Sequence, residues 1–176
     1  MFKKHWLSIL VAFVIPLVTV FWWWGGFNAV SITEAQRGPY RFAYLDHQGD
    51  FSKLPDTQRQ VRRLLEEQHI RKGAMITVLL DDPRKTERKQ LRAQTGYLID
   101  AAAQVGEPLK AGSIPARPVL VAEVHAAALL APSKAYQALH DYLKARQLDI
   151  RMPTVEIYAS PVEVYKVGDL SVEMER

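Results

Sequence analysis

The segment from Thr154 to Tyr158 places a carboxylate and a phenol two residues apart, a spacing that could do chemistry. Successive side chains of a strand point to opposite faces, so Glu156 and Tyr158 share one face and Val155 and Ile157 the other. We expect the apolar pair to pack on helices and Glu156 with Tyr158 to face a groove. A carboxylate in a partly buried apolar groove has a raised pKa and favours a cationic ligand or acts as an acid or base.

Two other readings of the acidic residues stay open. Glu156 could pair with a nearby arginine or be solvated, which would make its role structural. Glu123 falls in a predicted strand over residues 118–124 and could join Glu156 across the groove. Two carboxylates there would suit a dication or acid–base hydrolysis, whereas a glutamate at a strand end in water would do neither.

Aromatic and imidazole side chains supply the remaining candidates. Tyr40, Tyr97 and Tyr158 could stack on a ligand or make cation–π contacts of about 0.5–2 kcal/mol each, although ordinary packing also uses tyrosines. His47 and His125 lie at strand ends, where repeated structural turns are a simpler reading than haem ligation. The sequence has no cysteine, which excludes disulfides and thiolate chemistry. We expect neither a cofactor nor a metal site.

The elements that would position these residues occur in the same order twice: strand, helix, strand, strand. Apolar residues alternate in the strands and recur every three or four residues in the helices. The first set is strand 40–45, helix 55–72, and strands 74–80 and 96–99. The second set is strand 118–124, helix 132–147, and strands 154–158 and 170–174.

The two sets align without a gap at an offset of 78 residues. Apolar positions then match apolar ones, and Pro83 falls on Pro161. Two repeats are too few for a solenoid, so we expect them to share one sheet. The predicted fold class is α+β: a tandem βαββ duplication of two SH2-like halves, about 38–100 and 116–176. Their mainly antiparallel sheet would carry both helices on one face and a groove on the other.

The N-terminal run from Trp6 to Trp24 has no charged residue and predicts a transmembrane helix. Nineteen residues at about 1.5 Å each span about 28 Å, close to the hydrocarbon core of a bilayer. A cleaved signal peptide is the alternative, but its apolar run is shorter and ends in small residues. We therefore predict an anchor over 1–27 and a domain over 28–176. Because Lys3 and Lys4 precede the helix, the N-terminus would be cytoplasmic and the domain outside, periplasmic at a bacterial inner membrane.

The charge distribution bounds the partners. The formal net charge is +4, and hydrophobic residues make up 48% of the chain, enough for a packed core. A nucleic-acid surface needs a one-sided basic stripe, and the one basic cluster, residues 84–92, is typical of a solvated loop. We expect no nucleic-acid partner, while a protein partner stays possible.

Four short motifs follow one another within the duplication. They are His47-Gln48-Gly49-Asp50-Phe51, Leu80-Asp81-Asp82-Pro83, Ile114-Pro115-Ala116 and Pro153-Thr154-Val155-Glu156-Ile157-Tyr158. In this order they resemble the GyrI-like small-molecule-binding domain, of the superfamily that includes AraC-type effector-binding domains and SOUL haem-binding proteins. With the anchor, the arrangement is most similar to the testis-expressed ER-phagy receptors and their bacterial relatives.

The resemblance implies two βαββ halves around a concave groove that binds small, often cationic or amphipathic molecules. It also implies that the glutamate of the Glu-x-Tyr strand, here Glu156, recognises the ligand. Some relatives hydrolyse reactive natural products with a glutamate and aromatic residues. The second half departs from the pattern, because no glycine follows His125 as Gly49 follows His47.

The leading hypothesis is therefore a membrane-tethered module that binds a small amphipathic or cationic ligand in the groove. The first alternative is a hydrolase of reactive xenobiotics that uses Glu156. The second is a protein-interaction module with a vestigial groove.

Overall fold

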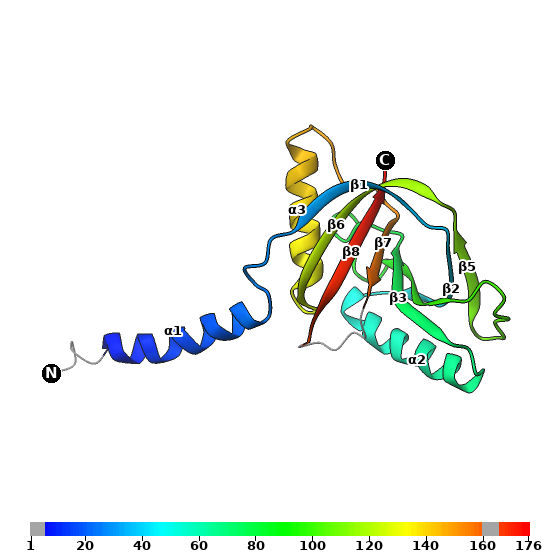
Figure 1. Cartoon of the computed structure of the whole chain (residues 1–176), viewed down its shortest axis with the longest axis horizontal. Helices are drawn as coiled ribbons and strands as arrows, with labels where there is room; N and C mark the ends of the chain where they lie inside the picture. Colours follow the sequence, from blue (N-terminus) through cyan, green and yellow to red (C-terminus); the bar gives the residue numbers. More distant parts are fainter. Residues whose placement is uncertain (1–5, 160–165) are drawn as a thin grey trace.

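The computed structural model describes residues 6–159 and 166–176. Three α-helices and eight strands follow along the chain (Figure 1). The helices are α1 (Trp6–Trp23), α2 (Leu54–Glu67) and α3 (Ala131–Lys144). The strands are β1 (Ser31–Arg37), β2 (Tyr40–Gln48), β3 (Lys72–Leu79), β4 (Arg92–Ile99), β5 (Lys110–Ile114), β6 (Arg117–Ala127), β7 (Thr154–Tyr158) and β8 (Val167–Glu175).

All eight strands form one antiparallel sheet in the order β1-β6-β8-β7-β3-β4-β2-β5. The order is symmetrical about the β7–β3 pair, so β6-α3-β7-β8 mirrors β2-α2-β3-β4. The predicted α+β class with an antiparallel sheet is confirmed. The two edge strands, β1 and β5, were not predicted, because SITEAQR and KAGSI lack the apolar alternation of the inner strands.

The sheet is strongly curled, because its edge strand β1 connects directly to β2, the seventh strand in the order. Gly38 makes this short connection at φ 95°, a conformation that glycine adopts without strain. A Cβ at Gly38 would also lie 2.9 Å from the carbonyl oxygen of Pro115. The curl brings Tyr40 of β2 within hydrogen-bonding distance of Glu173 of β8, four strands away in the order.

Helices α2 and α3 cover the same face of the sheet, each on its own half. Val61 and Leu65 of α2 pack with Ala43, and Leu139 and Leu143 of α3 pack against β6 and β8. The opposite face is also apolar at its centre. Its cluster consists of Phe42, Ile76, Val78 and Val155.

Helix α2 ends at Glu67, five residues before the predicted end at 72. His69 adopts a left-handed conformation, with φ 55°, and the N–H of Ile70 donates to the carbonyl oxygen of Leu65 at 2.9 Å. These two features terminate a helix by satisfying its last carbonyl groups. The residues that follow enter β3.

The prediction of an N-terminal transmembrane helix must be corrected. Among residues 6–159 and 166–176, no helix is long and apolar enough to cross a membrane. Helix α1 has 18 residues, with Pro16 inside it and tryptophans at both ends. The expected single-pass membrane topology, with the domain outside, is therefore wrong.

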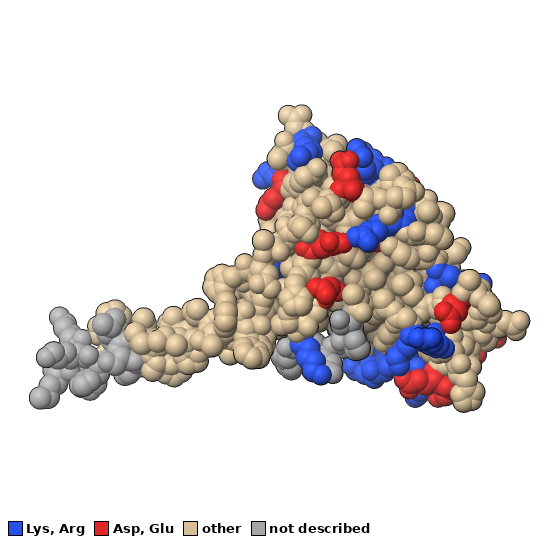
Figure 2. Space-filling view, viewed as in Figure 1, with Lys and Arg blue, Asp and Glu red and all other residues tan. Residues whose placement is uncertain are grey.

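Helix α1 extends away from the sheet (Figure 1). On the face shown in Figure 2, the Lys, Arg, Asp and Glu side chains lie on the domain that follows α1. Those charges are mixed in sign. Hydrogen bonds attach the segment after α1 to the domain. The N–H of Ala127 donates to the carbonyl oxygen of Trp24 at 2.9 Å, Lys134 Nζ donates to that of Gly26 at 2.5 Å, and Asn28 Nδ2 donates to that of His125 at 2.6 Å.

Candidate functional site

A row of polar side chains crosses the middle of the sheet on the face that carries α2 and α3. Thr95 of β4 lies opposite Thr77 of β3, and Thr77 lies opposite Glu156 of β7. The hydroxyl oxygens of the two threonines are 2.7 Å apart. All three side chains are buried. The row therefore occupies the junction between the two symmetrical groups of strands.

Each helix contributes one polar side chain over this row. Gln58 of α2 donates from Nε2 to Thr95 Oγ1 at 3.2 Å. Tyr136 of α3 lies 2.7 Å from Thr154 Oγ1 and also hydrogen-bonds Glu156. When Glu156 is ionised it can only accept, so the Tyr136 hydroxyl then donates its proton to Glu156 and accepts from Thr154. We call the set Gln58, Thr77, Thr95, Tyr136, Thr154 and Glu156 the polar seam.

Glu156 is a buried carboxyl group with an altered acidity. Its exposed fraction is 8%, and burial raises its pKa from 4.5 to about 7, while the Tyr136 hydrogen bond opposes that rise. Among the described residues, no basic side chain contributes to its pKa. Near neutral pH the group is therefore part carboxylate and part carboxylic acid. Burying an unpaired charge is costly, and burial raises the pKa for that reason.

An apolar cavity of about 440 Å³ lies beside the polar seam, and Tyr136 lines it. This volume falls within the range of about 300–1,000 Å³ typical of small-molecule sites. Leu79, Ile150 and Met152 supply apolar walls. The other lining residues are Asp82, Pro83, Arg84, Ser133, Gln137 and His140.

The charges at the far end of this cavity neutralise one another. Asp82 is buried, and it accepts from Arg84 Nε at 3.0 Å and from Arg84 Nη2 at 2.7 Å. Arg84 also donates to Asp149 at 3.0 Å. These hydrogen bonds hold the pKa of Asp82 below its ordinary value. Asp82 thus has a counter-ion, Arg84, which Glu156 lacks among the described residues.

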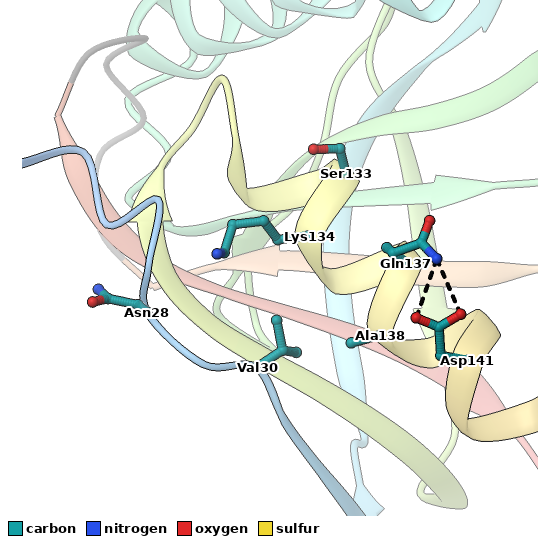
Figure 3. A pocket seen from close by; sticks show the side chains of 7 residues that line it. All are labelled: Asn28, Val30, Ser133, Lys134, Gln137, Ala138 and Asp141. Carbon is teal, nitrogen blue, oxygen red and sulfur yellow. Dashed lines mark hydrogen bonds between the residues drawn. The ribbon is translucent and has the colours of Figure 1, made fainter. Parts of the chain in front are cut away.

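A second hollow, of about 550 Å³, lies on the outer side of α3 beside the segment 28–30 (Figure 3). Its polar groups are already engaged. Gln137 donates to both oxygens of Asp141, at 3.0 and 3.1 Å, and Lys134 donates to the carbonyl oxygen of Gly26. No buried ionisable group lines it among the residues described. We therefore take the cavity beside Glu156 as the candidate site.

The structure reverses the predicted direction of the β7 side chains. Glu156 and Tyr158 face the helices, whereas Val155 and Ile157 pack in the apolar cluster on the opposite face. The prediction assumed that only the helix-covered face is apolar, but the curl of the sheet buries both faces. Tyr158 lies close enough to Glu156 for the carboxylate, together with burial, to raise the pKa of its phenol.

The other three predicted side chains lie elsewhere. Tyr97 of β4 packs beneath α2 with Val61. Tyr40 lies on the helix-free face and donates to Glu173 at 2.6 Å. Glu123 is on that face too, where its exposed carboxylate pairs with Arg37 at 2.5 Å. The predicted pairing of Glu123 with Glu156 across one groove is wrong, because the two project from opposite faces.

His47 occupies a structured turn. Its Nδ1 lies 3.0 Å from Thr57 Oγ1 and its Nε2 lies 3.2 Å from the carbonyl oxygen of Asp50. Both ring nitrogens therefore have partners within the turn that leads into α2. His125, its counterpart in the second half, is exposed and pairs with Asp169 at 2.6 Å.

Sequence reasoning missed Tyr136 and Gln58, although the duplication contained a signal for both. The offset that matches Val61 with Leu139 also matches Gln58 with Tyr136, three residues earlier on the same helix face. Polar groups at one matched position on the buried faces of both helices indicate a polar centre between the halves.

The chain matches the GyrI-like small molecule binding domain over residues 30–174. No curated protein matches it in sequence. The expected likeness to ER-phagy receptors is not among the similarities found.

Three solved structures share the fold at low identity. The EcmrR C-terminal domain has a TM-score of 0.67 and 9% identity, with coverage of 83% of this chain and 96% of that one. EcmrR in complex with DNA has a TM-score of 0.62 and 10% identity, with coverage of 99% of this chain and 70% of that one. SAV2435 bound to tetraphenylphosphonium has a TM-score of 0.56 and 9% identity, with coverage of 82% of this chain and 94% of that one. The family match spans most of the chain, and the chain belongs to the GyrI-like small-molecule-binding domain family.

Proposed function

We propose that this protein binds a small amphipathic organic cation in the cavity beside the polar seam, with Glu156 as the carboxylate that recognises the positive charge. One observation carries the proposal: Glu156 is a buried carboxyl group without a counter-ion among the described residues, and its hydrogen-bond partner Tyr136 lines an apolar cavity. The family match to a small-molecule-binding domain supports the same conclusion.

The electrostatics favour a cation over a neutral or anionic ligand. A bound positive charge would supply the counter-ion that Glu156 lacks, and the low polarity of the site would strengthen that attraction. It would also lower the pKa of Glu156, so that binding expels a proton near neutral pH. A neutral ligand would leave the ionised carboxylate without a counter-ion, and an anion would be repelled by it.

Tyr136 controls the route to Glu156 in this proposal. Its side chain both lines the cavity and hydrogen-bonds the carboxylate, so it stands between the two. A ligand that reaches Glu156 must turn the phenol aside, which replaces one hydrogen bond with an ion pair. The freed ring, together with Tyr158, would then offer aromatic faces to the cation.

A pair of probes with the same shape and opposite charge tests the proposal. Tetraphenylphosphonium, the ligand of SAV2435, and tetraphenylborate are added to the full chain and to Glu156→Gln, and the melting temperatures are compared. At a hundred times the dissociation constant a ligand stabilises by about 2.7 kcal/mol. We expect the phosphonium alone to raise the melting temperature, and the rise to shrink strongly in Glu156→Gln. Equal rises with both probes, or in both proteins, would overturn the proposal.

A further inference from the structure

We propose that the cavity also recognises a second feature of its ligand, a neutral hydrogen-bond acceptor that lies about one helical turn from the positive charge. His140 recognises this acceptor. This inference rests on the proposed cation site at Glu156. It narrows the ligand class from amphipathic cations in general to cations that carry a carbonyl, amide or ether oxygen.

The two recognition points lie in line along α3. Tyr136 and His140 are four residues apart, so they occupy the same helix face with Cβ atoms about 6 Å from each other. Both line the cavity. Tyr136 marks the end at Glu156, and His140 marks the end at Arg84. The apolar side chains of Ile150 and Met152 also line the cavity, so a hydrocarbon body suits it.

Arg84 fixes the orientation and tautomer of His140. Its Nη1 lies 3.3 Å from His140 Nδ1, and a guanidinium nitrogen can only donate. In the neutral imidazole, Nδ1 therefore accepts and Nε2 carries the hydrogen. Nε2 has no hydrogen-bond partner in the part of the chain that the structure describes. A donor at the cavity wall is thus available to an oxygen acceptor.

The position of Arg84 is itself held by carboxylates. Asp82 accepts from its Nε and Nη2, and Asp149 accepts from Nη2, which leaves Nη1 directed at the imidazole. These two carboxylates also cancel the positive charge of Arg84 and Lys85. That end of the cavity therefore offers a hydrogen bond without a net positive field, which favours a neutral acceptor over a carboxylate on the ligand.

Matched phosphonium probes separate this inference from the cation site. Tetraphenylphosphonium has no acceptor, and (4-acetylphenyl)triphenylphosphonium adds one carbonyl oxygen at the edge of a ring. Dissociation constants of both are measured by calorimetry with the full chain, His140→Phe, His140→Asn and Glu156→Gln. Phenylalanine keeps a planar ring without a donor, and asparagine restores an N–H.

We expect the native protein to bind the acetylated probe about fivefold more tightly than the parent, the effect of one hydrogen bond. His140→Phe should abolish that preference, so that the two probes bind this variant with equal affinity, and His140→Asn should restore part of the preference. Glu156→Gln should weaken both probes by the same factor.

Each failure has its own signature. If His140→Phe weakens both probes equally, or leaves the preference in place, the acceptor site is overturned while the cation site stands. If Glu156→Gln leaves both affinities unchanged, the cation site is overturned, and the acceptor site falls with it. Absence of binding by both probes to the native protein would overturn both.

Discussion

Two buried glutamates, one on each face of the sheet, show how differently the same fold treats a carboxylate. Glu173 of β8 lies on the helix-free face with an exposed fraction of 1%. Arg117 donates to it at 3.2 Å and Tyr40 at 2.6 Å. Glu156 of β7 lies on the helix-covered face, is also buried, and has only the Tyr136 hydroxyl as a hydrogen-bond donor to its carboxylate among the described residues.

The Glu173 carboxylate has its partners within the structure, whereas the Glu156 carboxylate has no counter-ion among the described residues. The Glu173 cluster joins β8 to β2 and β6, so it stabilises the curl of the sheet. Nothing in the fold requires a charge at Glu156, and its burial works against its ionisation. A buried carboxylate whose counter-ion is not supplied by the chain is a natural place for a cationic ligand.

The largest expected effect is on the structural side of the comparison. Arg117→Met leaves Glu173 buried without its cation, and removal of one partner of a buried ion pair typically costs about 3–5 kcal/mol. We expect a loss of that size in the free energy of unfolding, measured by urea denaturation. Arg37→Met, at the exposed pair with Glu123, is the matched control. Equal, small losses in both variants would mean that the Glu173 cluster does not stabilise the curl.

Removal of the other buried charge should stabilise the protein. The pKa of Glu156 is about 7 in the folded chain and about 4.5 when unfolded. Between these values the folded state holds a proton that the unfolded state has lost, so stability falls as pH rises from about 4.5 to 7 and stays lower above. Glu156→Gln removes this penalty, which corresponds to about 3 kcal/mol.

We therefore expect Glu156→Gln to raise the melting temperature at pH 8 and to change it little at pH 4.5. The experiment is a series of thermal denaturation curves across this range, with Glu123→Gln as the control. A loss of stability at pH 8 would show that the fold does use the Glu156 carboxylate.

A smaller effect should follow from removal of the phenol that contacts Glu156. Tyr136→Phe deletes the hydrogen bond that lowers the pKa of Glu156, so that pKa should rise further. We expect a loss of about 1 kcal/mol at pH 8, where the carboxylate is ionised, and less at pH 5. Tyr142→Phe, one more tyrosine of α3, is the control. The pH midpoint of the stability curve reports the change, and an unmoved midpoint would argue against the contact.

The smallest effect is expected at the exposed carboxylate that sequence reasoning had paired with Glu156. Glu123→Gln breaks an ion pair with Arg37 whose side chains are 46% and 38% exposed. Exposed pairs contribute at most about 1 kcal/mol. The unfolding free energy should change by about 0.5 kcal/mol or less, and binding of tetraphenylphosphonium should be unaffected. A clear loss of binding would place Glu123 in the site after all.

Much of the fold could be predicted from the sequence, because the inner elements follow simple periodicities. The strand–helix–strand–strand order and its repetition at 78 residues match β2-α2-β3-β4 and β6-α3-β7-β8. The edge strands could not be recognised, since a polar strand such as β1 gains its stability from pairing with β6 rather than from its own pattern.

The candidate site was predictable by residue type but not by geometry. Glu156 stood out as a carboxylate in an otherwise apolar strand, and the structure does bury it. Its direction could not be inferred, because Val155 and Ile157 on the other face have an apolar environment of their own. That apolar environment depends on the curl of the sheet, which arises from the short connection between β1 and β2. The residue pattern of β7 alone does not indicate this curl.

The most direct test of the central claim is a count of protons released when a cation binds. Tetraphenylphosphonium is titrated into the full chain by calorimetry at pH 6 and pH 9, each in two buffers that differ in ionisation enthalpy. With a free pKa of about 7, Glu156 is mostly protonated at pH 6 and ionised at pH 9. We predict release of close to one proton at pH 6, close to none at pH 9, and none at either pH for Glu156→Gln. Binding without proton release at pH 6, or the same release from Glu156→Gln, would contradict the claim that Glu156 receives the positive charge.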